Sequence, residues 1–135
     1  MKEYKVTKEQ FNNLWPKVMT GIGNDIVNEL VKTCPVNTGF LKNSIRYEVK
    51  NDKEVHIMMA DYWMYIEFGT PAHIIKAKNV NALHWKSGTK DVFATVVHHP
   101  GTDPNPFIRV MINTKLKKIV YNNIVRQLEN VSNSS

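Results

Sequence analysis

The sequence lacks the residue patterns from which disulfides and phosphate-binding loops are built. Its 135 residues contain one cysteine, Cys34, so no disulfide can form within the chain. No glycine-rich phosphate-binding pattern occurs. No apolar run approaches the ~20 residues that a membrane span needs, and the first residues lack the apolar core of a secretory signal. We therefore expect a protein that folds in a reducing cytoplasm and has no membrane segment.

The five histidines are not spaced like metal ligands. His56, His73 and His84 are far apart, and the adjacent His98 and His99 would point to opposite sides of an extended chain. Zinc sites need ligands clustered at turn or helix spacing. We predict no metal, no cofactor and no enzymatic activity, and we interpret Cys34 as a small packing residue.

The net charge is +6, from 18 basic and 12 acidic residues. Most of the excess is lysine spread along the chain, and the densest group is Lys115, Lys117 and Lys118. Arginine, which binds phosphate better through its planar fork, is rare. A basic surface is typical of a solvated protein and is also compatible with a nucleic-acid footprint, so both interpretations remain.

Apolar residues at steps of three and four predict one long helix over residues 7–33. Thr7 and Gln10 have the form of a capping box, and Pro35 ends the pattern. Pro16 either begins the main helix at its first turn or kinks a longer one.

A second helix is predicted over residues 105–129, with Asn105 as its cap and Pro106 at the first helical position. Residues 130–135 are polar and predict a disordered tail.

Between these helices, residues 45–97 predict an antiparallel sheet with a loop inserted at residues 70–81. Alternating apolar residues predict a hairpin around residues 51–53. Two further strands are predicted at 82–86 and 92–97. The whole chain, residues 1–135, is then a single α+β domain in which about four antiparallel strands pack against a long N-terminal and a long C-terminal helix.

The stretch from Tyr62 to Thr70 is ambiguous. Its spacing is helical, but its aromatic and β-branched residues suit a strand. We expect a short helical turn or irregular segment that leads into extended residues 67–70. Residues 36–44 are expected to form a structured turn in which Gly39 is available for a positive φ.

Four short motifs place turn-forming residues beside apolar anchors: Pro35–Ile45, Tyr62–Thr70, Ala82–Trp85 and His99–Ile108. Aromatic residues beside shaped loops are typical of subunit interfaces. Glu67 is interpreted as a structural or interface carboxylate, because no second group suited to acid–base catalysis accompanies it. The candidate interface residues are Tyr62, Trp63, Tyr65, Glu67, Phe68, Pro100, Gly101 and Phe107.

Three of these motifs together resemble a family of tailed-phage neck or tail-completion proteins. The resemblance lies in Pro-x-x-Thr-Gly-x-Leu-x-x-Ser-Ile at 35–45, Tyr-x-x-Tyr-x-Glu-Phe-Gly-Thr at 62–70, and His-Pro-Gly-Thr with Pro-Phe at 99–107. It implies a structural virion protein, made in the host cytoplasm, that assembles as a homo-oligomeric ring, sixfold by expectation. The ring would join the head connector to the tail tube or tail terminator and would contact DNA only as a channel lining.

Two other functions remain open at this point. One is a small basic nucleic-acid-binding protein or a ribonuclease-like toxin, for which salt-dependent binding would be diagnostic. The other is a regulatory or scaffolding module that binds one partner without forming a ring.

Overall fold

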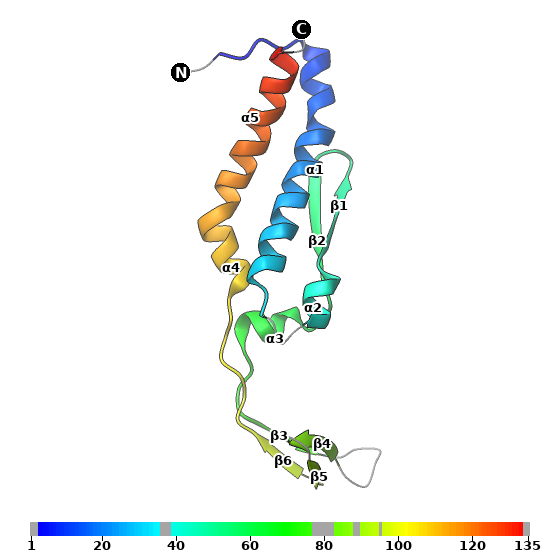
Figure 1. Ribbon diagram of the computed structural model, residues 1–135, viewed down its shortest axis with the longest axis vertical. Coiled ribbons are helices and arrows are strands. Elements are labelled where there is room, and N and C mark those ends of the chain that lie inside the picture. The colour runs from blue at the N-terminus through cyan, green and yellow to red at the C-terminus, as the bar shows by residue number, and fades with distance from the viewer. Residues whose placement is uncertain (1–2, 36–38, 77–82, 88–89, 95, 134–135) are drawn as a thin grey trace. The chain divides into compact units, whose positions relative to one another are not determined.

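The computed structural model describes residues 3–35, 39–76, 83–87, 90–94 and 96–133 (Figure 1). Within residues 73–99 it describes the backbone of the strands and not the side chains. These residues fall into two compact units. We call Met1–Trp63 together with Pro106–Ser135 the helix–hairpin unit, and Met64–Asn105 the ladder unit. Each unit is described by itself.

The first helix of the helix–hairpin unit is α1, Lys8–Thr33. The predicted capping box is confirmed, because Gln10 N donates to Thr7 Oγ1 (3.1 Å) and Thr7 N donates to Gln10 Oε1 (2.9 Å). The helix runs through Pro16, so the alternative in which Pro16 begins it is wrong. Its buried residues form one ridge at steps of four, with Gly23 beside it: Leu14, Val18, Ile22, Ile26 and Leu30.

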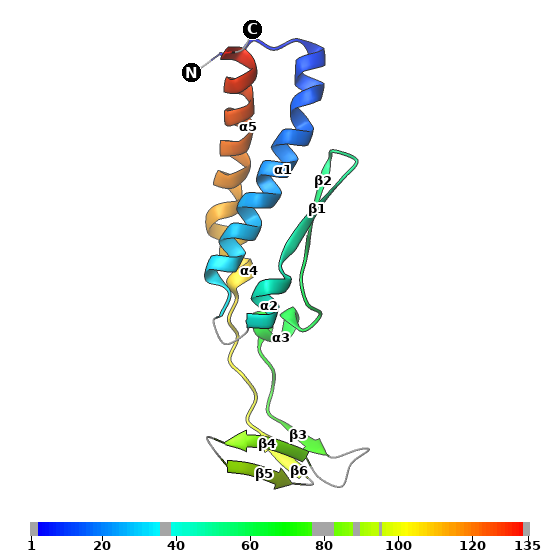
Figure 2. The same cartoon turned by 45° about the vertical axis from the view of Figure 1, so that its right-hand side comes forward.

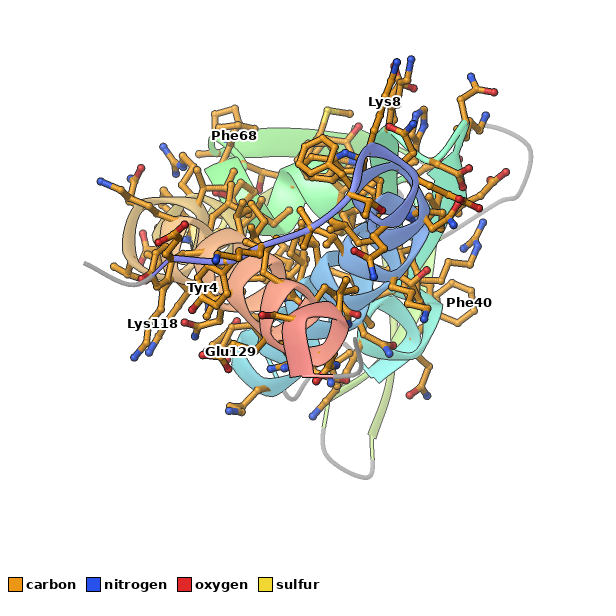
Figure 3. All side chains as sticks on the ribbon, turned by 90° about the horizontal axis from the view of Figure 1, so that it is seen from above. Tyr4, Lys8, Phe40, Phe68, Lys118 and Glu129 are labelled. Atoms are coloured by element: carbon orange, nitrogen blue, oxygen red, sulfur yellow. The ribbon has the colours of Figure 1, made fainter. Side chains whose placement is uncertain are left out.

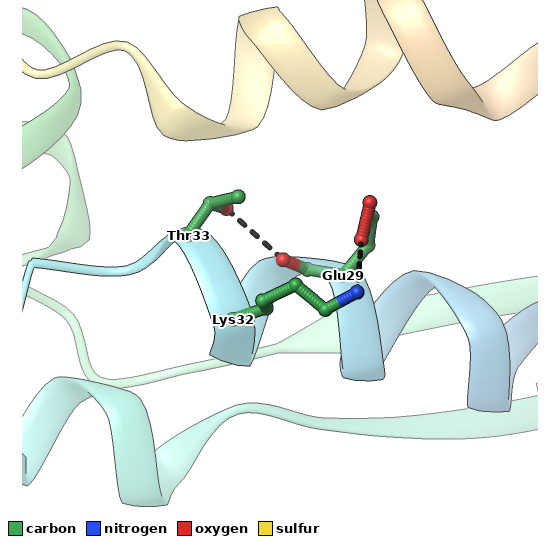
Figure 4. A network of polar contacts seen from close by, with 3 residues as sticks. All are labelled: Glu29, Lys32 and Thr33. Atoms are coloured by element: carbon green, nitrogen blue, oxygen red, sulfur yellow. Dashed lines mark hydrogen bonds and ion pairs between the residues drawn. The ribbon is translucent and has the colours of Figure 1, made fainter.

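The last turn of α1 is closed by local polar contacts. Thr33 Oγ1 donates to the Glu29 carbonyl oxygen at 3.0 Å, and the Lys32 ammonium lies 3.5 Å from the Glu29 carboxylate (Figure 4). The Cys34 N–H then donates to the Leu30 carbonyl oxygen and ends the helix. These contacts satisfy carbonyl groups that a helix end otherwise leaves to water.

The C-terminal helical segment is longer than predicted and has three parts. They are α4 (Phe107–Met111), the π-helical turn η2 (Ile112–Leu116) and α5 (Lys117–Asn133). The prediction of Asn105 as the cap is wrong, because Pro106 is the N-cap and makes no side-chain hydrogen bond. The prediction of a disordered tail from residue 130 is also wrong up to Asn133, because α5 continues that far; residues 134–135 lie outside the described chain.

Helices α1 and α5 lie side by side in Figures 1 and 2 and are joined by a buried amide. Asn123 is fully buried, and its Nδ2 donates to Asp25 Oδ2 and to the Ile119 carbonyl oxygen, both at 2.8 Å. Gly21 faces this amide, and a Cβ at Gly21 would collide with Asn123 Oδ1. The glycine therefore allows close helix packing at the cost of about 1 kcal/mol in helix propensity.

The predicted hairpin is confirmed as β1, Arg46–Lys50, paired antiparallel with β2, Glu54–Met58. Asn51 and Asp52 have φ of 54° and 56°, as a type I′ turn requires, and both residue types tolerate this conformation. The hairpin packs on α1, where the Tyr47 ring occupies the space that a side chain at position 23 would need.

Before β1, the short helix α2 spans Gly39–Ser44. Gly39 does not have a positive φ, contrary to the use expected for it. The adjoining residues 36–38 lie outside the described chain. Ser44 links α2 to the end of the hairpin, because its Oγ accepts the Ala60 N–H at 2.8 Å.

The ladder unit contains most of α3 (Trp63–Phe68) and two antiparallel strand pairs. Strand β3, His73–Lys76, pairs with β6, Val96–His99; strand β4, Leu83–Ser87, pairs with β5, Lys90–Ala94 (Figure 2).

The prediction of one sheet of about four strands is wrong: the described residues form three separate two-stranded sheets. Strand β3 lies within the stretch predicted to be a loop. The strand predicted at 92–97 overlaps two described strands that pair with different partners, β5 with β4 and β6 with β3, and residue 95 lies outside the described chain. The expectation that residues 67–70 are extended is wrong for residues 67 and 68, because both belong to helix α3. The α+β class with long terminal helices is confirmed.

Candidate functional site

Helix α3 displays three large apolar side chains on its surface. Tyr65 is 60% exposed, Phe68 55% and Met64 47%. Positions 64, 65 and 68 are related by steps of three and four, so these side chains lie on one helix face. Exposed aromatic side chains grouped in this way are typical of protein–protein contact surfaces.

Glu67 is separated from that surface. The residue is 1% exposed and is one of two buried polar or charged residues in the described chain; the other is Asn123. Its burial shows that the carboxylate is not presented to solvent by the free chain. The interpretation of Glu67 as a polar pin in a subunit interface remains a prediction.

Two of the sequence motifs meet in the ladder unit through a pair of Gly-Thr dipeptides. Thr70 and Thr102 each donate a backbone N–H to the other's carbonyl oxygen at 3.0 Å, and their side-chain oxygens are 3.1 Å apart. Gly69 and Gly101 have φ of 72° and 84°, and each lies against the opposite backbone. Only glycine fits both the positive φ and this close approach. We call this arrangement the Gly-Thr clasp.

The clasp has the same register as the ladder beyond it. Thr70 faces Thr102, and three residues further along each strand His73 faces His99. Pro71 and Pro100 lie between, and proline has no N–H to donate to a ladder. Pro100 and Gly101, both candidate interface residues, thus stand in one interrupted antiparallel ribbon that begins at the clasp.

The remaining candidates lie in the helix–hairpin unit. Phe107 is 3% exposed and belongs to the hydrophobic core, so it is not on the surface of the free chain. Tyr62 is half-buried, and its ring stacks on Phe40 with centroids 6.2 Å apart. Phe40, which is 74% exposed, was not among the sequence candidates, although it lies in the first motif.

An apolar groove of about 590 Å³ lies in the helix–hairpin unit. Its walls come from α1, β2, α4 and the π-helical turn η2, and Arg46 and Asp61 are its charged residues. Its other lining residues are Ile26, Leu30, Ile57, Met58, Met59, Trp63, Ile108, Met111, Ile112 and Leu116. Of the predicted interface residues, only Trp63 is among them. The sequence did not predict the groove, because its walls come from several elements and because no local sequence pattern predicts the π-helical turn that forms one of them.

Among the described residues, one titratable group has a clearly shifted pKa, the carboxyl of Glu54. Glu54 Oε2 lies 2.9 Å from His56 Nε2, and this hydrogen bond, together with the charge of His56, lowers the pKa of the exposed Glu54 carboxyl. No three described His, Cys, Asp or Glu residues are grouped so that they could hold a metal ion. No helix in the described chain is both long and apolar enough to cross a membrane.

Comparison with known proteins gives one match. Residues 3–69 match the family model HK97-gp10_like, described as "Bacteriophage HK97-gp10, putative tail-component". This range contains α1, α2, the hairpin and α3, and with them the motif Pro35–Ile45 and all of the motif Tyr62–Thr70 except Thr70. No curated protein and no solved structure matches the chain. Over residues 3–69, just under half of its length, the chain is thus similar to this phage tail-component family, which confirms the resemblance found in the sequence.

Proposed function

We propose that the protein is a structural virion protein that assembles as a homo-oligomeric ring at the head–tail joint of a tailed phage, as a neck or tail-completion protein. The family match over residues 3–69 carries this proposal. A tail component works within the virion and binds other phage structural proteins. The proposed partners are further copies of the chain, six to a ring, together with the head connector and the tail-tube or tail-terminator proteins.

The surfaces of the chain support a docking role. Met64, Tyr65 and Phe68 are about half exposed or more on α3, and an aromatic side chain of this kind buries 150–250 Å² when covered. A head-to-tail ring needs two different surfaces that fit each other. The aromatic face of α3 is the candidate for one surface. Gly101 in the clasp and the adjoining Pro100 are candidates for the other, because the clasp holds the backbone at Gly101.

The proposal is tested by measuring assembly. Native mass spectrometry and negative-stain microscopy should show closed rings of the purified protein, alone or after mixing with head connector or tail tube. Tyr65→Ala should reduce ring formation, while a similarly exposed tyrosine outside the proposed contact, changed as Tyr121→Ala, should leave it intact. A chain that stays monomeric with both partners present would contradict the proposal.

A second candidate function, nucleic-acid binding, is favoured by one observation. From Phe107 to Leu128 the chain contains five basic residues and no acidic residue, and Lys115, Lys117 and Lys118 are exposed. In a ring, such a helix would suit a DNA channel. A gel shift at two salt concentrations tests this, since each phosphate contact adds about 0.9 to the logarithmic salt slope.

A further inference from the structure

Residues 107–128 carry nearly all of the net charge of the chain. They cover α4, η2 and most of α5 and contribute +5 of the net +6, so the rest of the chain is almost neutral. We propose that the exposed face of this segment binds the phosphate backbone of a nucleic-acid duplex. This inference rests on the second candidate function, which it deepens by naming the contact residues and the kind of partner, and it does not depend on the ring.

We call the proposed surface the basic face. It consists of six exposed residues, which are Lys115, Lys117, Lys118, Tyr121, Asn122 and Arg126. Lys118, Asn122 and Arg126 follow one another at steps of four on α5, so they form one row along the helix. Lys117 and Tyr121 form a second row beside it. Figure 3 shows the Lys118 side chain extending outward from the ribbon.

A polar groove of about 290 Å³ adjoins the basic face, and its walls come from α1, η2 and α5. Its charged lining residues are Asp25, Glu29, Lys32, Lys115 and Lys118. Both carboxylates have partners, because Asp25 Oδ2 accepts a hydrogen bond from Asn123 Nδ2 at 2.8 Å and the Glu29 carboxylate lies 3.5 Å from the Lys32 ammonium. Within the described ranges, no carboxylate forms an ion pair with Lys115 or Lys118. These two ammonium groups are therefore available to an external anion.

The residue types of the basic face suit a phosphate backbone. Lysine, arginine, asparagine and tyrosine side chains all donate hydrogen bonds to phosphate oxygens. The basic face contains one aromatic residue, Tyr121. Single-stranded nucleic acid is bound by stacking successive bases on aromatic side chains, which one tyrosine cannot provide. A duplex, whose bases are already stacked on one another, needs no such platform.

A second copy of the chain is a poorer match than a duplex, because its acidic residues form no complementary surface. The densest group of carboxylates in the helix–hairpin unit is the hairpin, where residues 46–54 contain three acidic and three basic residues in alternation. The net charge of the hairpin is therefore zero. Duplex DNA carries one negative charge per about 1.7 Å of helix axis, which complements a segment of net charge +5.

The test compares two double variants that both have a net charge of +4. Lys115→Gln with Lys118→Gln removes two charges from the basic face, and Lys8→Gln with Lys17→Gln removes two exposed charges from α1. The probe is a fluorescently labelled DNA duplex of random sequence. Fluorescence anisotropy measures its binding to the full chain between about 50 and 200 mM salt. Circular dichroism confirms that every variant is folded.

The wild type should bind the duplex with a dissociation constant of roughly 1–100 μM near physiological salt, as non-specific binding does. Lys115→Gln with Lys118→Gln should weaken binding by roughly tenfold or more at the lower salt concentration. The logarithmic salt slope of this variant should be smaller by about 1.8, because two phosphate contacts are lost. Lys8→Gln with Lys17→Gln should keep the wild-type slope.

An equal loss of slope in the two double variants would show that binding follows net charge alone. That result would overturn the basic face and leave nucleic-acid binding intact. A wild-type chain that binds poly-glutamate or a single DNA strand as tightly as the duplex would overturn the duplex as the partner. A wild-type chain that does not bind the duplex even at the lower salt concentration would overturn both this inference and the second candidate function, while the ring proposal would stand.

Discussion

Thr70 and Thr102 donate their backbone N–H groups to each other's carbonyl oxygens, with both N···O distances at 3.0 Å. The two residues are 32 positions apart and end the Gly-Thr pairs of two separate motifs. The sequence alone indicates a docking role for both motifs. In the structure the two motifs also have a common role within the chain, because their Gly-Thr pairs hydrogen-bond to each other and hold the two strands of the ladder unit together.

The clasp predicts how glycine substitutions will act. Gly69→Ala and Gly101→Ala should each open the clasp, because alanine is strained at a positive φ and its Cβ would meet the opposite backbone. Backbone strain of this kind costs about 1–3 kcal/mol. Hydrogen exchange at the Thr70 and Thr102 amides should accelerate accordingly. Gly39→Ala is the control, since a Cβ there meets nothing within 4 Å; equal protection in all three variants would refute the clasp.

Replacing Asn123 by aspartate should weaken the packing of α1 against α5 in a pH-dependent way. Asn123→Asp replaces a donor by an acceptor beside the Asp25 carboxylate, so it should cost about 3–5 kcal/mol of unfolding free energy near neutral pH. Protonation of one carboxyl should reduce the defect in acid. Adding Asp25→Asn restores a donor–acceptor pair and should recover part of the loss in urea denaturation. No recovery in the double variant would show that the two side chains are not coupled.

Phe107 and Tyr65 should respond differently to truncation, although both were candidate interface residues. Phe107→Ala empties a buried site and should lower the unfolding free energy by about 3–5 kcal/mol. Tyr65→Ala, at a side chain that is 60% exposed, should change it by less than about 0.5 kcal/mol. Thermal and denaturant unfolding of the monomer measure both. A stable Phe107→Ala chain would contradict the assignment of this ring to the core.

The hairpin predicts a local pH effect. Because the hydrogen bond to His56 lowers the pKa of Glu54 in the folded chain, the pair favours folding above the ordinary carboxyl pKa. That contribution is lost as the pH falls through the lowered pKa. In an NMR titration, His56→Ala should move the pKa of Glu54 upward towards its ordinary value. Lys50→Gln should change the pKa of Glu54 less, because the Lys50 charge lowers it only weakly. An unchanged pKa in His56→Ala would rule out the pair as the cause.

Local sequence signals predicted the elements whose causes are local. The capping box of Thr7 and Gln10 and the hairpin turn at Asn51 and Asp52 were readable because the interacting groups are close in sequence. The long-range features were not readable in this way. Nothing near Gly21 indicates that Asn123 lies against it, and nothing near Thr70 names Thr102 as its partner.

In the candidate site, too, local features were predictable from the sequence and long-range packing was not. The aromatic content of residues 62–68 is compatible with burial either in the core or in a subunit interface, and in the structure Tyr65 and Phe68 are exposed. The same reasoning chose Phe107, because a proline-rich loop precedes it, but burial depends on which elements pack around the ring. Phe40 and Leu41 are adjacent apolar residues of one motif, and only the fold separates the exposed Phe40 from the buried Leu41.

The most direct measurement is electron microscopy of particles from a phage lacking this protein. Filled heads and separate tails should accumulate, and adding the purified wild-type chain should join them with a ring of this protein at the junction. Normally joined, infectious particles made in its absence would contradict the account.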